Sequence, residues 1–406
     1  MKIFIFTLGC PKNQVDSEKL AGTLVCAGYE LVDKPENADL IILNTCAFIS
    51  EAEHEAEEYI AKLSGIAPLL VIGCLPSRKA AQERMRDSWM IGDPPDEAEN
   101  ISMIARIIFW DPDQGSRLLD SYPYSYLKIA EGCSRRCSFC VIPWIRGRLR
   151  SREVKAILEE ARSIIELGKK EIILVAQETT QFGWDTGECL EDLLVAIDKL
   201  EGDFWLRLMY VHPDGMTRSL AAALASLDHL APYIHMPVQH LSGNVLKGMV
   251  RAGGQRAVER ALALVEKYLP DAFIRTELMV GFPGETEEDF RGLLNGIESG
   301  LFQRVAVFPF YNERGSRAWN MRQQDKRVVA GRYREAMEAA HDLHMRVQRG
   351  LVGKHMRLLV DEPGLARTGF DAPEVDFSVR VSEKLVPGDF HDARITGMYS
   401  GGDLVA

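Results

Sequence analysis

The sequence has no long apolar run and no recognisable export signal. None of its apolar stretches reaches the length of a membrane span. The N-terminal MKIFIFTLGCPKN is too short in its apolar part to be a signal peptide and has no cleavage site. We therefore expect a cytoplasmic protein with no membrane partner. Its eight cysteines should be reduced thiols, available to metal rather than to disulfides.

Basic residues are in deficit. The 406 residues include 48 Lys and Arg against 59 Asp and Glu, which gives a formal net charge of −11. An acidic protein is a poor general binder of polyphosphate backbones, although a local basic patch can overcome this. The balance favours a basic partner, such as a basic protein, and disfavours tRNA.

A fourth cysteine is missing from the motif that says most about function. In EGCSRRCSFC, Cys133, Cys137 and Cys140 follow the spacing C-x3-C-x2-C. Three thiolates at this spacing can hold three corners of a [4Fe-4S] cubane and leave the fourth iron open to a small molecule. Electron-transfer ferredoxins close the cluster with four cysteines, and structural zinc sites also take four ligands. The alternatives are a zinc knuckle or a tight loop of incidental cysteines.

Residues 1–115 read as a Rossmann-like α/β unit that contains a second set of cysteines. Three apolar runs predict buried parallel strands at residues 3–6, 40–43 and 69–72. Cys10, Cys46 and Cys74 each follow one of these runs by a few residues. The carboxyl ends of parallel strands meet at one edge of a sheet, where open α/β folds place their ligands. The pattern therefore predicts a second three-thiolate cluster site.

For this second set the alternative is that each cysteine is a small buried hydrophobe. Gly9 and Gly73 precede two of the three and would let the backbone approach a bound group. Cys26 lies in a helical pattern and Cys189 begins another. We expect both of these to be packing residues and not ligands.

Residues 120–348 alternate between strand and helix patterns. The strands are expected at residues 126–130, 171–176, 205–210, 233–238, 273–280 and 304–309. The helices include residues 153–167, 190–200, 256–268 and 287–298. Eight βα units would close a full barrel, so about six predict a partial, open-sided (βα)6 barrel. Its first strand precedes the Cys133 motif, which places that motif at the carboxyl-end face.

Residues 351–406 lose helical periodicity and alternate in short runs separated by Pro and Gly. This predicts a small antiparallel β-barrel of about five strands. Lys and Arg number six in this segment and Asp and Glu nine, so the barrel carries a charge of −3.

The three segments in this order resemble the radical S-adenosylmethionine (SAM) methylthiotransferase family. Its members have an N-terminal domain with three cluster-binding cysteines, a central radical SAM barrel and a C-terminal TRAM barrel. The resemblance covers essentially the whole chain. It implies two [4Fe-4S] clusters, one on Cys10, Cys46 and Cys74 and one on Cys133, Cys137 and Cys140. It also implies SAM and an electron donor such as flavodoxin or ferredoxin.

Within the family, the chain resembles the branch that modifies an aspartate of the small-subunit ribosomal protein numbered twelve. The matching stretches are TLGCPKNQVDSEKLAG, NTCAFISEAEHEA, CSFCVIPWIRGRLRSR, LVAQETTQFG and MPVQHLSGNVLKGMVR. Ala47 stands where that branch usually has Gly. An acidic C-terminal barrel suits a basic ribosomal-protein loop, whereas an RNA-reading barrel should be basic. The alternative is the branch that modifies an adenosine of tRNA.

The resemblance also implies a mechanism. Attaching –SCH3 to an unactivated carbon requires a radical supplied by a cofactor. SAM reduced at the Cys133 motif would give a 5'-deoxyadenosyl radical, which would take hydrogen from the β-carbon of the aspartate. The N-terminal cluster would hold sulfur, and a second SAM would methylate it. A non-catalytic iron–sulfur carrier is the competing class, but it should close each cluster with four cysteines.

The resemblance suggests further SAM contacts around the barrel rim. Phe139, by its motif position, should lie near the adenine, and Gln177 and Glu178 end a strand that faces the ribose or the substrate. Gly281 and Glu285 belong to a strand-to-helix turn that resembles a SAM-contacting turn, and an ordinary turn is equally consistent with the pattern.

Two capping boxes and two groups of basic residues complete the sequence predictions. Ser50 with Glu53 and Thr286 with Asp289 predict helix starts. A basic patch beside the cysteine motif should bind a carboxylate or form a solvated face, and it consists of Arg146, Arg148, Arg150 and Arg152. Three histidines near strand ends are expected to pack or to support the site rather than to bind metal: His212, His235 and His240.

Overall fold

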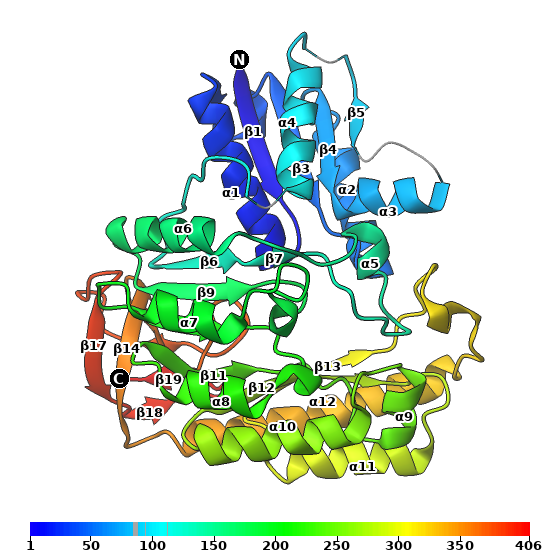
Figure 1. The fold of residues 1–406 in the computed structure, drawn as a ribbon, viewed down its shortest axis with the longest axis vertical. Helices are drawn as coiled ribbons and strands as arrows, with labels where there is room; N and C mark the ends of the chain where they lie inside the picture. Colours follow the sequence, from blue (N-terminus) through cyan, green and yellow to red (C-terminus); the bar gives the residue numbers. More distant parts are fainter. Residues whose placement is uncertain (84–87, 94, 112) are drawn as a thin grey trace.

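The computed structural model describes residues 1–83, 88–93, 95–111 and 113–406, which form three units along the chain (Figure 1). The first unit contains a five-stranded sheet in the order β2-β1-β3-β4-β5. Neighbouring strands pair parallel except β4 and β5, which pair antiparallel. The strands are β1 (Lys2–Thr7), β2 (Glu30–Leu31), β3 (Leu40–Thr45), β4 (Leu69–Gly73) and β5 (Trp89–Ile91).

Helices cover both faces of this sheet because its central strands are apolar on both sides. Along β3, Leu40 and Ile42 pack in one apolar cluster with α1 and α4, whereas Ile41 and Leu43 pack in another with α2 and α3. All three predicted strands of this unit are confirmed. The helices are α1 (Pro11–Cys26), the 3-10 helix η1 (Pro35–Asn37), α2 (Ser50–Leu63), α3 (Cys74–Glu83) and α4 (Ala98–Trp110).

The start of α2 differs from the prediction. Ile49 is the N-cap residue, and no side chain caps the helix. The backbone amide and the hydroxyl of Ser50 instead donate to Glu313, at 2.9 and 3.1 Å. Arg78 binds the same carboxylate at 2.6 Å, and Glu53 lies 3.8 Å from Arg78. The helix start is fixed by the second unit, through a contact that no local sequence pattern contains.

The second unit is a six-stranded parallel sheet in the order β13-β12-β11-β10-β9-β6. Strands β6 and β13 are its two edges, so the barrel is open on one side, as predicted. Its strands are β6 (Tyr124–Lys128), β9 (Glu171–Val175), β10 (Trp205–Leu208), β11 (Leu230–His235), β12 (Phe273–Val280) and β13 (Arg304–Pro309).

Helices line the outer face of this sheet and enclose one continuous apolar core. Leu174, Leu206, Ile234 and Leu278 point into that core from four successive strands and are completely buried. The helices are α6 (Val154–Glu166), α7 (Leu190–Asp198), α8 (Arg218–Ala225), α9 (Gly243–Gly248), α10 (Gly254–Tyr268), α11 (Glu287–Glu298) and α12 (Lys326–Arg349). None of the helices in the described residues combines the length and the apolar character needed to cross a membrane.

Short elements in the loops of the second unit carry much of the candidate site. The paired strands β7 (Ala130–Glu131) and β8 (Arg150–Ser151) bracket the Cys133 motif. The remaining short elements are α5 (Ile142–Ile145) and the 3-10 helices η2 (Thr179–Gln181), η3 (Pro213–Gly215) and η4 (Arg317–Asn320).

The third unit is a curled sheet of short strands in the order β17-β14-β15-β16-β19-β18. It is mostly antiparallel, as predicted, with one parallel pair, β16 and β19. The strands are β14 (His355–Glu362), β15 (Leu365–Thr368), β16 (Val379–Arg380), β17 (Phe390–Arg394), β18 (Gly397–Met398) and β19 (Leu404–Val405). Figure 1 shows this unit beside the barrel, at its left flank, with the first unit above the barrel.

Buried ion pairs attach the third unit to the barrel. Asp371, in the loop after β15, accepts a hydrogen bond from Arg304 at 2.7 Å. Asp376, in the same loop, binds Arg275 at 2.5 Å and accepts from the Tyr233 hydroxyl at 2.7 Å. The acidic character of the third unit therefore serves partly to hold it to cationic side chains of the barrel strands.

The ion pair between Arg367 and Glu171 gives a test of this attachment. Arg367 Nη2 lies 2.8 Å from Glu171, and its other contacts include Asp361 at 2.6 Å. Arg367→Met should lower the free energy of unfolding by about 3–5 kcal/mol, because it leaves buried carboxylates short of a partner. Arg357→Met, which breaks an exposed pair with Asp203, should cost less than about 1 kcal/mol. Urea unfolding followed by circular dichroism measures both, and equal losses would contradict the prediction.

Candidate metal centre and active site

The three cysteines of the first unit converge at the carboxyl ends of adjacent strands. Cys10 follows β1 and is the N-cap of α1, Cys46 follows β3, and Cys74 begins α3 directly after β4. The close approach requires glycine at position 9, where φ is +102° and an added Cβ would lie 2.6 Å from the Cβ of Cys46. The sheet order thus brings together thiols that are far apart in sequence, as predicted.

Asn13 fixes the loops that carry these thiols. Its side-chain Nδ2 donates to the carbonyls of Leu8 and Thr45, both at 2.9 Å, and so ties the ends of β1 and β3 together. Its Oδ1 lies 4.0 Å from the sulfur of Cys10 and 3.9 Å from that of Cys74. One fully buried amide therefore sets the spacing of the site.

A buried guanidinium supplies positive charge to the same thiols. Arg146, only 1% exposed, places Nε and Nη2 each 3.4 Å from the Cys74 sulfur. Burial works against ionisation of Cys10, but the charges of Lys12 and Arg146 outweigh it and hold the pKa of this thiol below its ordinary value. The first turn of α1 adds the favourable end of a helix dipole. Position and charge both favour a thiolate at Cys10, whereas burial raises the pKa of Cys46 to about 12 and also raises that of Cys74.

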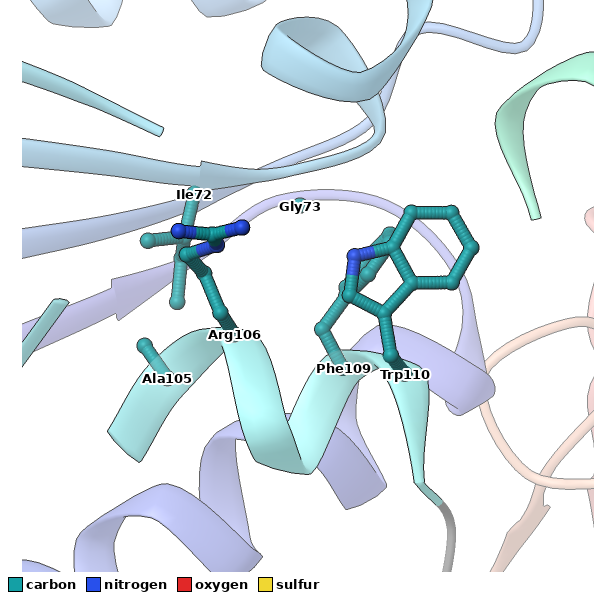
Figure 2. A pocket seen from close by; sticks show the side chains of 6 residues that line it. All are labelled: Ile72, Gly73, Ala105, Arg106, Phe109 and Trp110. Atoms are coloured by element: carbon teal, nitrogen blue, oxygen red, sulfur yellow. The ribbon is translucent and has the colours of Figure 1, made fainter. Parts of the chain in front are cut away.

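Aromatic side chains close the back of this thiol site. A small cavity behind Gly73 is lined by Ile72 and by one face of α4, including Phe109 and Trp110 (Figure 2). The Phe109 ring also packs under the Arg146 guanidinium, 3.9 Å from its central carbon. Apolar contact on one face of Arg146 leaves its edge to bind the polar groups.

Arg146 also joins the thiol site to the barrel. Its Nη1 binds Asp16 of α1 at 2.9 Å and Glu131 of β7 at 3.2 Å. Lys128, the last residue of β6, binds the same two carboxylates. Gln177, predicted to face SAM or substrate, donates to Glu131 at 2.5 Å. Two cations and two carboxylates form one buried network between the first and second units.

The second cysteine triplet lies in the loop between β7 and α5, at the carboxyl-end face of the barrel, as predicted. Ser138 anchors the loop, with its amide donating to Met249 at 2.8 Å and its hydroxyl to Gly248 at 2.9 Å. Burial raises the pKa of Cys140 to about 12 and that of Cys133 to about 11, and the neighbouring thiols add to both shifts. Iron binding here would release protons from these thiols.

Further polar side chains surround the triplet. Arg251 places Nη1 3.5 Å from the Cys137 sulfur. Glu178 accepts from Arg135 at 3.0 Å and from the Thr180 amide at 2.8 Å. Phe139 is half-buried and packs against the barrel core. Glu178 follows β9, Arg251 follows α9, and Phe139 lies in the triplet loop itself, so these groups border the triplet from three different segments.

The turn that contains Gly281 and Glu285 is closed by its own carboxylate. Glu285 accepts from the amides of Gly281 at 2.6 Å and Phe282 at 3.3 Å, and it binds Arg332 at 2.9 Å. Gly281 is needed for packing, because an added Cβ would lie 2.6 Å from Val329 of α12. This carboxylate therefore shapes the turn. The capping box of Thr286 and Asp289 at the start of α11 is confirmed.

The predicted basic patch is divided between different environments. Arg146 and Arg152 are buried, and Arg152 pairs with Asp113 at 2.7 Å and Glu160 at 2.8 Å. Arg148 is exposed and Arg150 is half-buried. The predicted alternative of a solvated face is therefore wrong for Arg146 and Arg152, because both bind carboxylates from distant parts of the chain.

The three histidines are buried, as predicted, and each uses Nδ1 as an acceptor. The bonds run from Asp214 N to His212 (3.1 Å), from Tyr210 N to His235 (3.3 Å) and from Ser242 N to His240 (2.9 Å). These contacts fix the loops that follow β10 and β11.

The pKa of His240 gives a pH prediction. Burial lowers it from 6.5 to about 4. Because the folded value lies below the unfolded one, the stabilisation is present above pH 6.5 and is lost as the pH falls towards 4. In His240→Asn, the side-chain oxygen can still accept from Ser242. This variant should lose roughly 3 kcal/mol less than the parent between pH 7 and pH 4. Urea unfolding at both pH values tests this, and parallel losses in the two proteins would contradict it.

Both sets of thiols fit an iron–sulfur cubane with one open iron. The other two cysteines lie apart from them, since Cys26 ends the helix that Cys10 begins, and Cys189 is the N-cap of α7. Both are exposed, so their prediction as packing residues is wrong. Among the described residues, no three His, Cys, Asp or Glu side chains are arranged around a single metal ion. A cubane takes its thiolates on separate irons, so the three thiols of a set need not converge on one ion.

Family models match the chain in the order of its three units. Residues 2–91 match "Uncharacterized protein family UPF0004", residues 127–296 the radical SAM superfamily and residues 352–406 the TRAM domain. With the two three-thiol sites, this combination defines the class of protein as a radical SAM methylthiotransferase.

Curated relatives identify the family within this class. The ribosomal protein uS12 methylthiotransferase RimO of Thermotoga maritima is 38% identical over 413 residues, which cover 96% of each chain. The RimO proteins of Carboxydothermus hydrogenoformans and Akkermansia muciniphila are 37% and 36% identical, each covering 98% of this chain and 97% of the relative. The chain belongs to the RimO family.

A solved structure supports the fold alone. The radical SAM methyltransferase TsrM from Kitasatospora setae, with cobalamin and a [4Fe-4S] cluster bound, matches with a TM-score of 0.56 at 17% identity. The match covers 76% of this chain and 74% of that one.

Sequence reasoning missed the polar residues that support the thiols. Asn13 and Lys12 stand in the quoted CPKN stretch, but neither had a predicted role. The partners Asp16 and Glu131 have no motif of their own. Among these residues only Arg146 was singled out in the sequence, as part of a basic run. Its partner Cys74 lies 72 residues away, so the sequence does not indicate their contact.

Proposed function

We propose that this protein attaches a methylthio group to the β-carbon of an aspartate of ribosomal protein uS12. One observation carries the proposal: two separate three-thiol sites, each without a fourth cysteine, lie at strand ends in a chain that matches uS12 methylthiotransferases along 96% of its length. An electron carrier would close both sites with cysteine.

We assign one [4Fe-4S] cluster to Cys133, Cys137 and Cys140 and the other to Cys10, Cys46 and Cys74. When bound, the clusters and SAM supply reductive cleavage of SAM, a hydrogen-abstracting radical and the methylthio group. Phe139, Gln177, Glu178, Gly281 and Glu285 remain our proposed SAM contacts. For Glu285 the contact is indirect, because its carboxylate is engaged within the turn.

The chain's own residues would position and shield this chemistry. Arg146 offsets the negative charge of the N-terminal thiolates, and the Ser138 contacts hold the triplet loop against the α9 end. Arg135 binds both Glu178 and Asp214 at 3.0 Å and so fixes these two carboxylates beside the triplet loop. Held in these positions, the groups would need little rearrangement when SAM binds.

The partners follow from charge and from the family. A net charge of −11 suits a basic ribosomal protein. We propose units at residues 1–115, 120–348 and 351–406, which would carry the N-terminal cluster, the SAM chemistry and substrate binding. Flavodoxin or ferredoxin would donate electrons, and the cytoplasm would be the site of action.

The first test is a competition assay. The anaerobically reconstituted enzyme receives SAM, a reductant, a peptide copying the uS12 loop and unmodified tRNA, and mass spectrometry follows the methylthio group. Label on the peptide aspartate alone is the expected result. Label on tRNA would overturn the choice of substrate while keeping the radical mechanism. SAM left intact, with label on neither, would point to an electron carrier.

Cysteine substitutions test the assignment of the two clusters. Cys74→Ser and Cys137→Ser should each remove about half of the bound iron. Cys74→Ser should still cleave SAM but transfer no methylthio group, whereas Cys137→Ser should do neither. Cys26→Ser changes an exposed thiol and should retain all iron and activity. Full iron in either cluster variant would contradict the assignment.

A further inference from the structure

Lys12 carries a buried ammonium group with no carboxylate partner among the described residues. The side chain is only 8% exposed, although a lysine at this level of burial is usually paired. None of the ion pairs formed within the described ranges includes it. The charge of Lys12 interacts with the Cys10 thiol and with Tyr210 rather than with a paired carboxylate. A buried cation that lacks a carboxylate ion pair is costly, and such a cost is typical of binding sites.

Lys128 is the instructive comparison. It is fully buried and binds both Asp16 and Glu131, so its charge is satisfied within the protein. Lys12 lies on the same helix as Asp16, one turn earlier, but Asp16 pairs with Lys128 and Arg146 instead. Its Nζ lies 3.7 Å from the centre of the Tyr210 ring, and an aromatic face compensates a cation only in part.

The other polar groups around Lys12 are already engaged. Glu277 of β12 influences Lys12 electrostatically but accepts from His235 Nε2 at 3.2 Å. The opposite nitrogen, His235 Nδ1, accepts from the Tyr210 amide, which leaves Nε2 as the donor to Glu277. Tyr210 itself has a φ of +61°, a strained value for a non-glycine residue. The Cys10 thiol and the side chain of Tyr210 also favour the charge of Lys12. The surroundings therefore hold a positive charge in a fixed geometry without a carboxylate ion pair.

We propose that Lys12 binds the side-chain carboxylate of the target aspartate. This rests on the proposed function and adds the residue that recognises the substrate. The reacting β-carbon of aspartate is bonded directly to the carboxylate carbon, so an anchor on the carboxylate fixes the reacting atom. Lys12 lies two residues after Cys10 and packs against Tyr210 at the end of β10. The anchored carboxylate would therefore lie between the first unit, with its thiols, and the barrel.

The same contact gives specificity for aspartate. An asparagine has nearly the same shape but no charge, and an adenosine has no carboxylate. A buried cation left without its counter-charge discriminates strongly against both, because the penalty of desolvation is then uncompensated.

The test is peptide binding, measured without turnover. The reconstituted holoenzyme with SAM but no reductant is titrated into fluorescein-labelled peptides that copy the uS12 loop, with Asp or Asn at the target position, and anisotropy gives Kd. The parent should prefer the Asp peptide by about 10- to 100-fold. Lys12→Met should bind the Asp peptide as weakly as the Asn peptide, and Lys12→Arg should keep most of the preference. Lys155→Met, at an exposed lysine, should behave as the parent.

Three results would overturn the inference. One is an undiminished preference for Asp in Lys12→Met. Another is equal binding of both peptides by the parent. The third is loss of about half of the iron in Lys12→Met, which would assign Lys12 to cluster retention. Failure of the proposed function is a separate observation, because there the parent would bind the peptide yet transfer no methylthio group to it when reductant is added.

Discussion

The guanidinium of Arg146 holds together the parts on which this structure depends. It is buried at the junction of the first unit and the barrel, where it contacts the Cys74 sulfur, Asn13, Asp16 and Glu131. A buried cation is stable only if its partners are fixed, and here they come from α3, α1 and β7. The relative position of the two thiol sites is thus tied to one electrostatic constraint. A lysine could not replace it, because the contacts use three nitrogens of a planar fork.

This constraint explains why the polar groups at the junction form a network. Arg146 and Lys128 balance Asp16 and Glu131, so the four charges cancel inside the protein. A second link, from Glu313 to Ser50 and Arg78, joins the loop after β13 to the start of α2. Two fixed links at separate points resist rotation of one unit against the other. Chemistry that uses two sites on one substrate would need that rigidity, since small displacements of reacting atoms are costly.

Features that depend on residues close together in the sequence could be predicted, whereas contacts between distant residues could not. Apolar runs fix strands locally, so β1, β3 and β4 and the convergence of Cys10, Cys46 and Cys74 could be predicted from spacing and the rules of parallel sheets. The capping box at Thr286 is also local, and it is confirmed. The box predicted at Ser50 was wrong because a residue 263 positions away takes its place. Partners of that kind, including those of Arg146, leave no periodic trace in the sequence.

The electrostatics of the molecule work on two scales that select different features of one substrate. Over the whole surface the charge is negative, which attracts a basic protein at long range. At the junction, Asp16 and Glu131 balance Arg146, whereas Lys12 forms no ion pair with a carboxylate of the described residues. A basic loop that carries an acidic residue would satisfy both fields. Different residues would then recognise the partner protein and its reacting aspartate. Many surface carboxylates would attract the partner, whereas one buried lysine, Lys12, would bind the aspartate.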